Sequence, residues 1–88
     1  MEYYSMKVVY CDDIKQYPEL ISNDVRRNEV TKQLERTTMF EVETPLNERA
    51  QWKIKDSIKR AFVGMVERVF IRPAFVDERI EYVRKQLA

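Results

Sequence analysis

The sequence contains no histidine, one cysteine (Cys11) and one glycine (Gly64) among its 88 residues. A single cysteine cannot form a disulfide within the chain, and a zinc site of the Cys/His type is excluded without histidine. One glycine is too few for a glycine-rich phosphate loop. A serine or cysteine nucleophile generally needs a neighbouring base, most often histidine. We therefore expect a protein with no enzymatic activity, no metal and no cofactor.

Long apolar runs are also missing. No stretch reaches the roughly 18 residues of a transmembrane helix. Residues 1–11 lack the basic start and the small-residue cleavage site of a signal peptide. An unpaired cysteine fits a reducing compartment. The sequence therefore predicts a soluble protein of the cytoplasm, or of the host cytoplasm if the chain is viral.

Charged residues of both signs are abundant, and so are apolar residues. The 16 basic and 15 acidic residues nearly cancel, and 44% of the chain is hydrophobic, which is too much for a disordered segment. A chain of this length makes one domain, residues 1–88. Its core is small, because such a chain buries only about 60% of the surface that the unfolded form exposes. We therefore expect self-association, as a homodimer or a higher oligomer, to supplement its stability.

The first half of the chain predicts a strand, a helix and a second strand. A strand is expected over residues 5–11, where Val8, Val9 and Tyr10 favour β-structure. Residues 22–36 open with three good N-cap residues and predict a helix. Residues 37–44 alternate apolar and polar side chains, which indicates a strand.

The second half predicts two helices. Thr44 and Pro45 are typical of a helix start, and apolar residues then recur at spacings of three and four, so a long helix is expected from Pro45 to Ile71. Pro73 ends it. A closing helix over residues 74–88 follows, and its apolar stripe consists of Val76, Ile80, Val83 and Leu87.

These elements predict a small α+β fold in the order β-α-β-α-α. A two-strand sheet would pack on the long helix and the C-terminal helix. Such a sheet is marginal by itself, so dimerisation could extend it.

The predicted long helix carries two apolar faces. One face can cover the sheet, and the closing helix is too short to cover all of the second. We interpret the second face as an intermolecular surface; the alternative is that this helix is the central element of the monomer core. The predicted partner-binding residues are Trp52, Lys55, Lys59, Val63, Val66 and Phe70.

Residues 49–60 gather five basic side chains and one acid around Trp52. Such a segment could grip phosphates and stack a base. The candidate nucleic-acid-binding residues are Arg49, Lys53, Lys55, Lys59 and Arg60. The nearly neutral net charge favours the alternative of a solvated helix face, with Asp56 paired to Arg60 at a spacing of four.

The acids Asp12, Asp13, Glu41 and Glu43 end or line the two predicted strands. If the strands were adjacent, these oxygens could bind a divalent metal. Alternating glutamates are, however, typical of a solvent-facing sheet surface. We therefore predict no metal site.

The sequence as a whole predicts a small non-enzymatic protein-binding module, an adaptor or an inhibitor of a larger macromolecular machine. It would act through the second apolar face of the long helix. Two alternatives stay open. One is a nucleic-acid-binding regulator that uses the basic segment, and the other is an oligomer that binds an anionic small ligand between its subunits.

Overall fold

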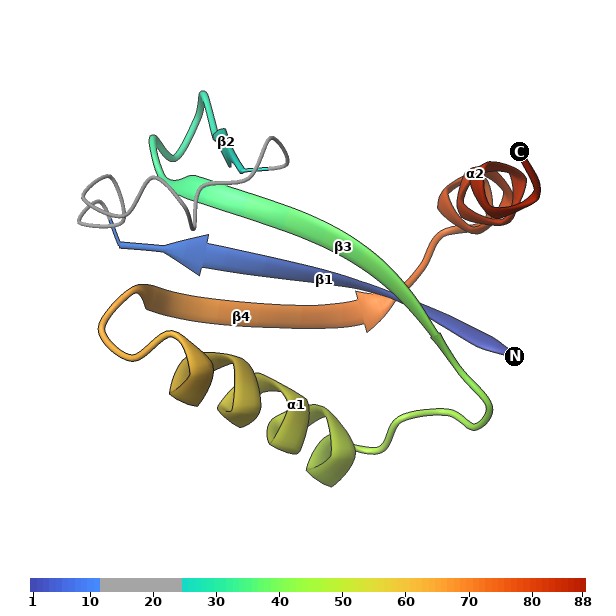
Figure 1. Ribbon diagram of the computed structural model, residues 1–88, viewed down its shortest axis with the longest axis horizontal. Helices are drawn as coiled ribbons and strands as arrows, with labels where there is room; N and C mark the ends of the chain where they lie inside the picture. The colour runs from blue at the N-terminus through green and yellow to red at the C-terminus, as the bar shows by residue number, and fades with distance from the viewer. Residues whose placement is uncertain (12–24) are drawn as a thin grey trace.

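The computed structural model describes residues 1–11 and 25–88, which form four strands and two helices (Figure 1). In chain order these are β1 (Glu2–Tyr10), β2 (Arg26–Arg27), β3 (Leu34–Val42), α1 (Glu48–Ala61), β4 (Val66–Pro73) and α2 (Val76–Leu87). The strands form one antiparallel sheet in the order β2-β3-β1-β4. The prediction of an α+β fold is confirmed, whereas the two-strand sheet and the β-α-β-α-α order are wrong.

Strand β1 is the centre of the sheet. It pairs with β3 along its whole length and with β4 from Tyr4 to Tyr10. Val8 therefore lies between Arg36 of β3 and Val69 of β4. Of the described residues that are buried, all except Val69 belong to this strand. Both neighbouring strands are thus organised around β1.

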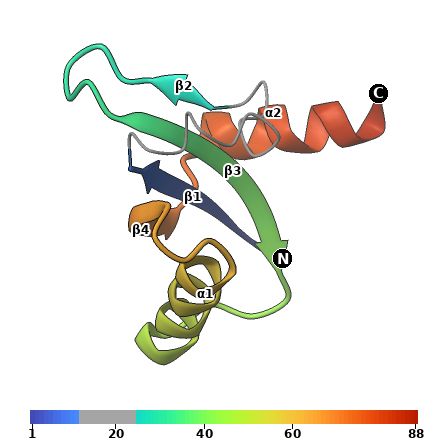
Figure 2. The same ribbon diagram turned by 60° about the vertical axis from the view of Figure 1, so that its left-hand side comes forward.

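The core lies between one face of the sheet and α1. Successive side chains of a strand point to opposite faces, so alternate residues of β1 share the face that α1 covers. Val8, Tyr10 and Val69 form the buried cluster, and Met6 and Ile58 pack against it. Figure 2 shows α1 and α2 on opposite sides of the sheet, so α2 does not cover this core.

The predicted helix from Pro45 to Ile71 is wrong at both ends. Helix α1 begins at Glu48, because the side chain of the N-cap residue Asn47 accepts a hydrogen bond from the N–H of Ala50 at 2.8 Å. It ends at Ala61. The apolar spacing that predicted a longer helix continues beyond Ala61, but the residues there form a turn and then strand β4.

Residues 62–65 form the turn that ends the helical backbone. The N–H of Met65 donates to the carbonyl of Phe62 at 2.9 Å. Gly64 is the third residue of this turn and has a φ of +80°, as a type II turn requires there. Strand β4 then pairs with β1 and places Val69 in the core. Pairing and burial outweigh the helical spacing of the apolar residues.

The predicted helix over residues 22–36 is wrong for its described part. Residues 25–36 contain β2, a turn and the start of β3, while 22–24 lie outside the described residues. The side-chain oxygen of Asn28 accepts hydrogen bonds from the N–H groups of Val30 and Thr31, at 2.8 and 3.0 Å. Such local bonds compete with the helix and favour a turn.

Three predicted elements are present with shifted limits. The strands expected at 5–11 and 37–44 appear as β1 and β3, each beginning three residues earlier. The closing helix expected at 74–88 appears as α2. Neither helix of the described chain has the length and apolar character needed to cross a membrane.

Replacing Gly64 with alanine tests the turn. Within a helix this change would stabilise the protein by about 1 kcal/mol. At the observed positive φ it should instead lower the free energy of unfolding by about 1–2 kcal/mol. Among the described residues, no atom beyond Gly64 and its two neighbours lies within 4 Å of the added Cβ, so the backbone conformation sets the result. Urea denaturation measures the change, and a gain in stability would contradict the turn.

Candidate functional site

Helix α2 is joined to the sheet by a short connection after β4. The N–H of Ala74 donates to the carbonyl of Tyr3 at 2.9 Å. The N-cap residue is Phe75, which has no side-chain acceptor, so only one half of a capping box is present. In that half, Oε1 of Glu78 accepts a hydrogen bond from the N–H of Phe75 at 2.9 Å. The helix start therefore depends on Glu78.

Arg72 of β4 forms a bidentate ion pair with Glu78. Its Nη1 and Nη2 atoms donate to Oε1 and Oε2 at 2.7 and 2.9 Å. The hydrogen bonds from Arg72 and from the backbone of Phe75 lower the pKa of Glu78 to about 2. The guanidinium carbon of Arg72 also lies 4.2 Å from the centroid of the Phe75 ring. These contacts fix the first turn of α2 against the end of β4.

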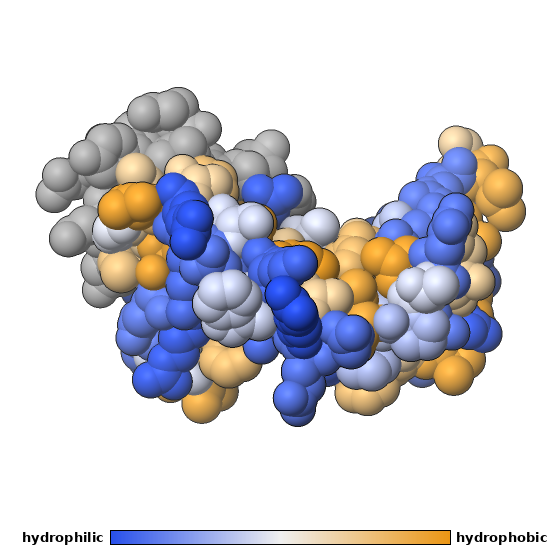
Figure 3. All heavy atoms as spheres, turned by 90° about the horizontal axis from the view of Figure 1, so that it is seen from below, coloured by the Kyte–Doolittle hydropathy of each residue, from blue (hydrophilic) through white to orange (hydrophobic). Residues whose placement is uncertain are grey.

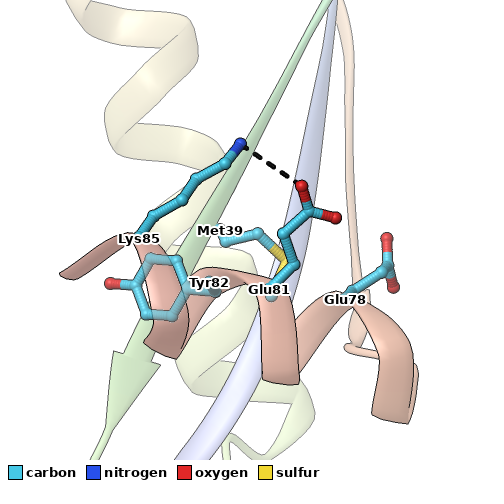
Figure 4. A pocket seen from close by; sticks show the side chains of 5 residues that line it. All are labelled: Met39, Glu78, Glu81, Tyr82 and Lys85. Atoms are coloured by element: carbon cyan, nitrogen blue, oxygen red, sulfur yellow. Dashed lines mark ion pairs between the residues drawn. The ribbon is translucent and has the colours of Figure 1, made fainter. Parts of the chain in front are cut away.

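The inner side of α2 faces the end of the sheet. The rings of Tyr82 and Tyr3 meet edge to face, with centroids 6.0 Å apart. The guanidinium carbon of Arg79 lies 5.7 Å from the Tyr3 ring centroid. A shallow groove of about 230 Å³ separates α2 from β3, and Figure 4 shows its lining residues, Met39, Glu78, Glu81, Tyr82 and Lys85.

Helix α2 carries four apolar residues that we name the α2 stripe, Val76, Ile80, Val83 and Leu87, of which Val83 is half-buried. Successive helical residues are about 100° apart, so Val76, Ile80 and Leu87 lie between about 120° and 160° from Tyr82 around the helix. Their exposed fractions are 63%, 49% and 84%. In Figure 3, hydrophobic spheres gather along the outer edge of the molecule at the end formed by α2. Three of the four stripe residues, Val76, Ile80 and Leu87, therefore face away from the sheet, and Val83 lies at the flank.

A second candidate surface lies on the sheet face opposite α1. It contains a groove of about 380 Å³, which we name the open-face groove, lined by Ser5, Lys7, Thr37, Phe70, Ile71 and Arg72. The Nζ atom of Lys7 lies 5.2 Å from the ring centroid of Phe70 and 3.9 Å from a carboxylate oxygen of Glu35. Phe70 is 46% exposed. This groove places an accessible aromatic ring among cationic side chains.

The predicted partner-binding residues do not form one surface. Trp52 is exposed on α1, with Lys55 and Lys59 on the same helix, while Val63 is exposed in the turn. Val66 packs against the core beside α1, whereas Phe70 lines the open-face groove. The prediction that these residues share a second apolar face of one long helix is therefore wrong. The helix ends at Ala61, the chain turns at residues 62–65, and β4 follows.

The predicted nucleic-acid-binding residues Arg49, Lys53, Lys55, Lys59 and Arg60 all lie on α1. Helical spacing places Arg49, Lys53 and Arg60 on the side away from the sheet, and Lys55 and Lys59 toward its flank. The Nε atom of Arg60 forms an ion pair with Asp56 at 2.8 Å. This pair is the one expected for a solvated helix face.

The acidic residues considered for a metal site are not brought together in the described chain. Glu41 is exposed on β3 and Glu43 lies beyond the end of that strand, while Asp12 and Asp13 fall outside the described residues. Within residues 1–11 and 25–88, no three Cys, Asp or Glu side chains are grouped to hold a metal ion.

Comparisons with protein-family models, with curated proteins and with solved structures found no match to this chain. The α2 stripe and the open-face groove are the two candidate interaction surfaces of the described chain. Sequence spacing identified the stripe residues but not the direction in which they point. The groove had no sequence signal, because its residues come from three strands paired out of chain order.

Replacing Glu78 with glutamine tests how α2 is attached. Because the pKa of Glu78 is lower in the folded protein than in the unfolded chain, its carboxylate stabilises the fold above about pH 4.5. This contribution is lost as the pH falls toward 2. We therefore expect a lower melting temperature for Glu78→Gln at neutral pH, and a difference from wild type that disappears in acid.

Circular dichroism at a series of pH values measures this difference. The matched control is Glu81→Gln, because among residues 1–11 and 25–88 Glu81 makes only an exposed ion pair, with Lys85 at 3.8 Å. Equal effects of the two substitutions at neutral pH would show that Glu78 does not hold the helix.

Proposed function

We propose that this chain is a non-enzymatic protein-interaction module that contacts its partner through the α2 stripe. The observation that carries the proposal is the exposure of Val76, Ile80 and Leu87 on the side of α2 away from the sheet. Removing a Val, Ile or Leu side chain from water stabilises a protein by roughly 1.5–3 kcal/mol. A row of such side chains left in solvent is typical of a surface that a partner covers.

The construction of α2 supports the same function. An isolated helix of about 12 residues is marginal in water, and α2 has 12. Its contacts with the sheet are at one end and along one side, through Arg72, Glu78, Tyr3 and Tyr82. These contacts leave the apolar side available to enter a complementary groove or to meet another helix, which is a common mode of protein recognition. An adaptor or an inhibitor would use the helix in this way.

The substitution Ile80→Glu tests whether the stripe lies outside the folding core. Glutamate is a good helix former, and Ile80 is half exposed. We expect the free energy of unfolding to change by less than about 0.5 kcal/mol. The control Val69→Glu should abolish folding, because Val69 is buried between β1 and α1. Urea denaturation of both variants measures this, and a large loss for Ile80→Glu would place the stripe in the core.

A photo-crosslinking side chain at position 80 tests the contact itself. In cells that produce the chain, irradiation should give one discrete protein adduct. The same side chain at position 53, exposed on α1, should give none. If position 80 yields no adduct, the stripe is not an interaction surface.

A second candidate function is binding of single-stranded nucleic acid at the open-face groove. The observation that favours it is the exposed ring of Phe70 beside Lys7; Arg72 lines the same groove, but its guanidinium is held by Glu78. An aromatic side chain on a sheet face, with a cation beside it, can stack a base while the cation contacts a phosphate. The basic side of α1 would then be a solvated face.

This candidate predicts that a labelled single-stranded oligonucleotide binds with an affinity that falls as salt rises. The substitution Phe70→Ala should remove about 1–3 kcal/mol of binding free energy. Trp52→Ala, on α1, should leave the affinity unchanged. Fluorescence anisotropy measures both. Weak binding that Phe70→Ala does not alter would exclude the groove as the site.

A further inference from the structure

We infer that the partner of the α2 stripe is the α2 helix of a second copy of this chain, packed antiparallel to the first across a two-fold axis. The inference rests on the proposed function, because it names the occupant of the same surface. It follows from the spacing of the apolar residues and from the charges beside them.

The spacing of the stripe is self-complementary. Its apolar residues are separated by four, three and four positions, which is the repeat of a helix that pairs with another helix. Because this pattern is symmetric about its midpoint, two antiparallel copies match. Val76 then meets the partner's Leu87, and Ile80 meets the partner's Val83. A two-fold axis makes each contact twice, as in an isologous dimer.

Charged residues beside the stripe select the antiparallel arrangement. Asp77 and Arg84 lie along one edge, and Arg79 and Gln86 lie along the other. In an antiparallel pair like edges meet, so Asp77 faces the partner's Arg84 and its symmetry mate repeats the contact. In a parallel pair opposite edges meet, and Arg79 would face the partner's Arg84. The first arrangement pairs opposite charges, and the second opposes like charges.

The charged groups needed for these contacts are available. Among the described residues, neither Asp77 nor Arg84 takes part in an ion pair or a side-chain hydrogen bond, although both are exposed. Their neighbours Glu78 and Lys85 are already paired, with Arg72 and Glu81. Asp77 and Arg84 are thus two charged residues of α2 that make no ion pair in the described part of the chain and that an antiparallel second copy would pair.

The small surface of α2 is typical of a weak interface. A helix of 12 residues is about 18 Å long, and an interface of two such helices lies below the size of most stable complexes. We therefore expect a weak dimer that forms reversibly in the micromolar range or above. The antiparallel orientation also places the opposite ends of the two helix dipoles side by side.

The experiment is sedimentation equilibrium of the full chain and two charge-reversal variants, Asp77→Arg and Arg84→Asp. Wild type should shift from monomer to dimer as its concentration rises. Each variant alone should dimerise at least tenfold more weakly, because like charges then meet twice. An equimolar mixture of the two variants should recover association to within about threefold of wild type, because every contact becomes an opposite-charge pair.

Mixing isolates the contact between chains, because each variant carries the same change at its own helix end whether alone or mixed. Ile80→Glu should abolish the dimer, and the control Trp52→Glu, on α1, should leave it intact. If Ile80→Glu also unfolds the chain, the mixture of the two charge-reversal variants still tests the dimer, because neither variant changes a residue of the stripe.

Two results would overturn the inference. One is a wild-type chain that stays monomeric at every concentration reached. The other is a dimer that neither the charge reversals nor Ile80→Glu weakens, which would use another surface. The proposed function fails separately, through the absence of a crosslink at position 80. A monomeric chain with a crosslinked foreign protein would overturn the second copy and leave the proposed function standing.

Discussion

The pairing of β1 on both of its edges is the constraint on which the rest of the structure depends. β3 and β4 are far apart in the sequence, and each is held by its hydrogen bonds to β1. The side of β1 that contains Val8 and Tyr10 supplies the floor on which α1 packs. Its first residues hold α2, through the carbonyl and the ring of Tyr3. A change that displaced β1 would therefore release both helices as well as both neighbouring strands.

The two helices are held by different interactions. α1 contributes to the stability of the core, whereas α2 carries the proposed interaction surface. α1 lies along the sheet with Ile58 against the buried cluster, so its apolar residues are used within the chain. α2 is held by an ion pair to Arg72 and by an edge-to-face contact between tyrosines. Polar and aromatic contacts occupy its inner side, and the apolar stripe is consequently left on the outer side. The geometry of the attachment, rather than the composition of the helix, creates the proposed interaction surface.

The two candidate surfaces do not compete for the same residues. The α2 stripe points away from the sheet, whereas the open-face groove is lined mainly by β1 and β4. Arg72 connects the two, because it lines the groove and also anchors Glu78 at the start of α2. A dimer formed through α2 would leave the groove of each copy accessible. It would also bring two such grooves into one assembly, which raises the avidity for any extended partner.

The sequence alone determined the features that local patterns control. The α+β class, the strands around Val8 and Phe40 and the apolar stripe of α2 all follow from residue preferences and spacing within a few turns or pleats. Only the tertiary structure decided the rest. Residues 66–73 have helical apolar spacing, yet they form β4, because pairing with β1 and burial of Val69 stabilise the strand. Residues 25–36 likewise form β2, a turn and the start of β3, and in the turn the side chain of Asn28 accepts hydrogen bonds from the backbone. The direction of the α2 stripe is set by contacts between residues more than seventy positions apart, such as Tyr3 and Tyr82, and local spacing carries no information about such contacts.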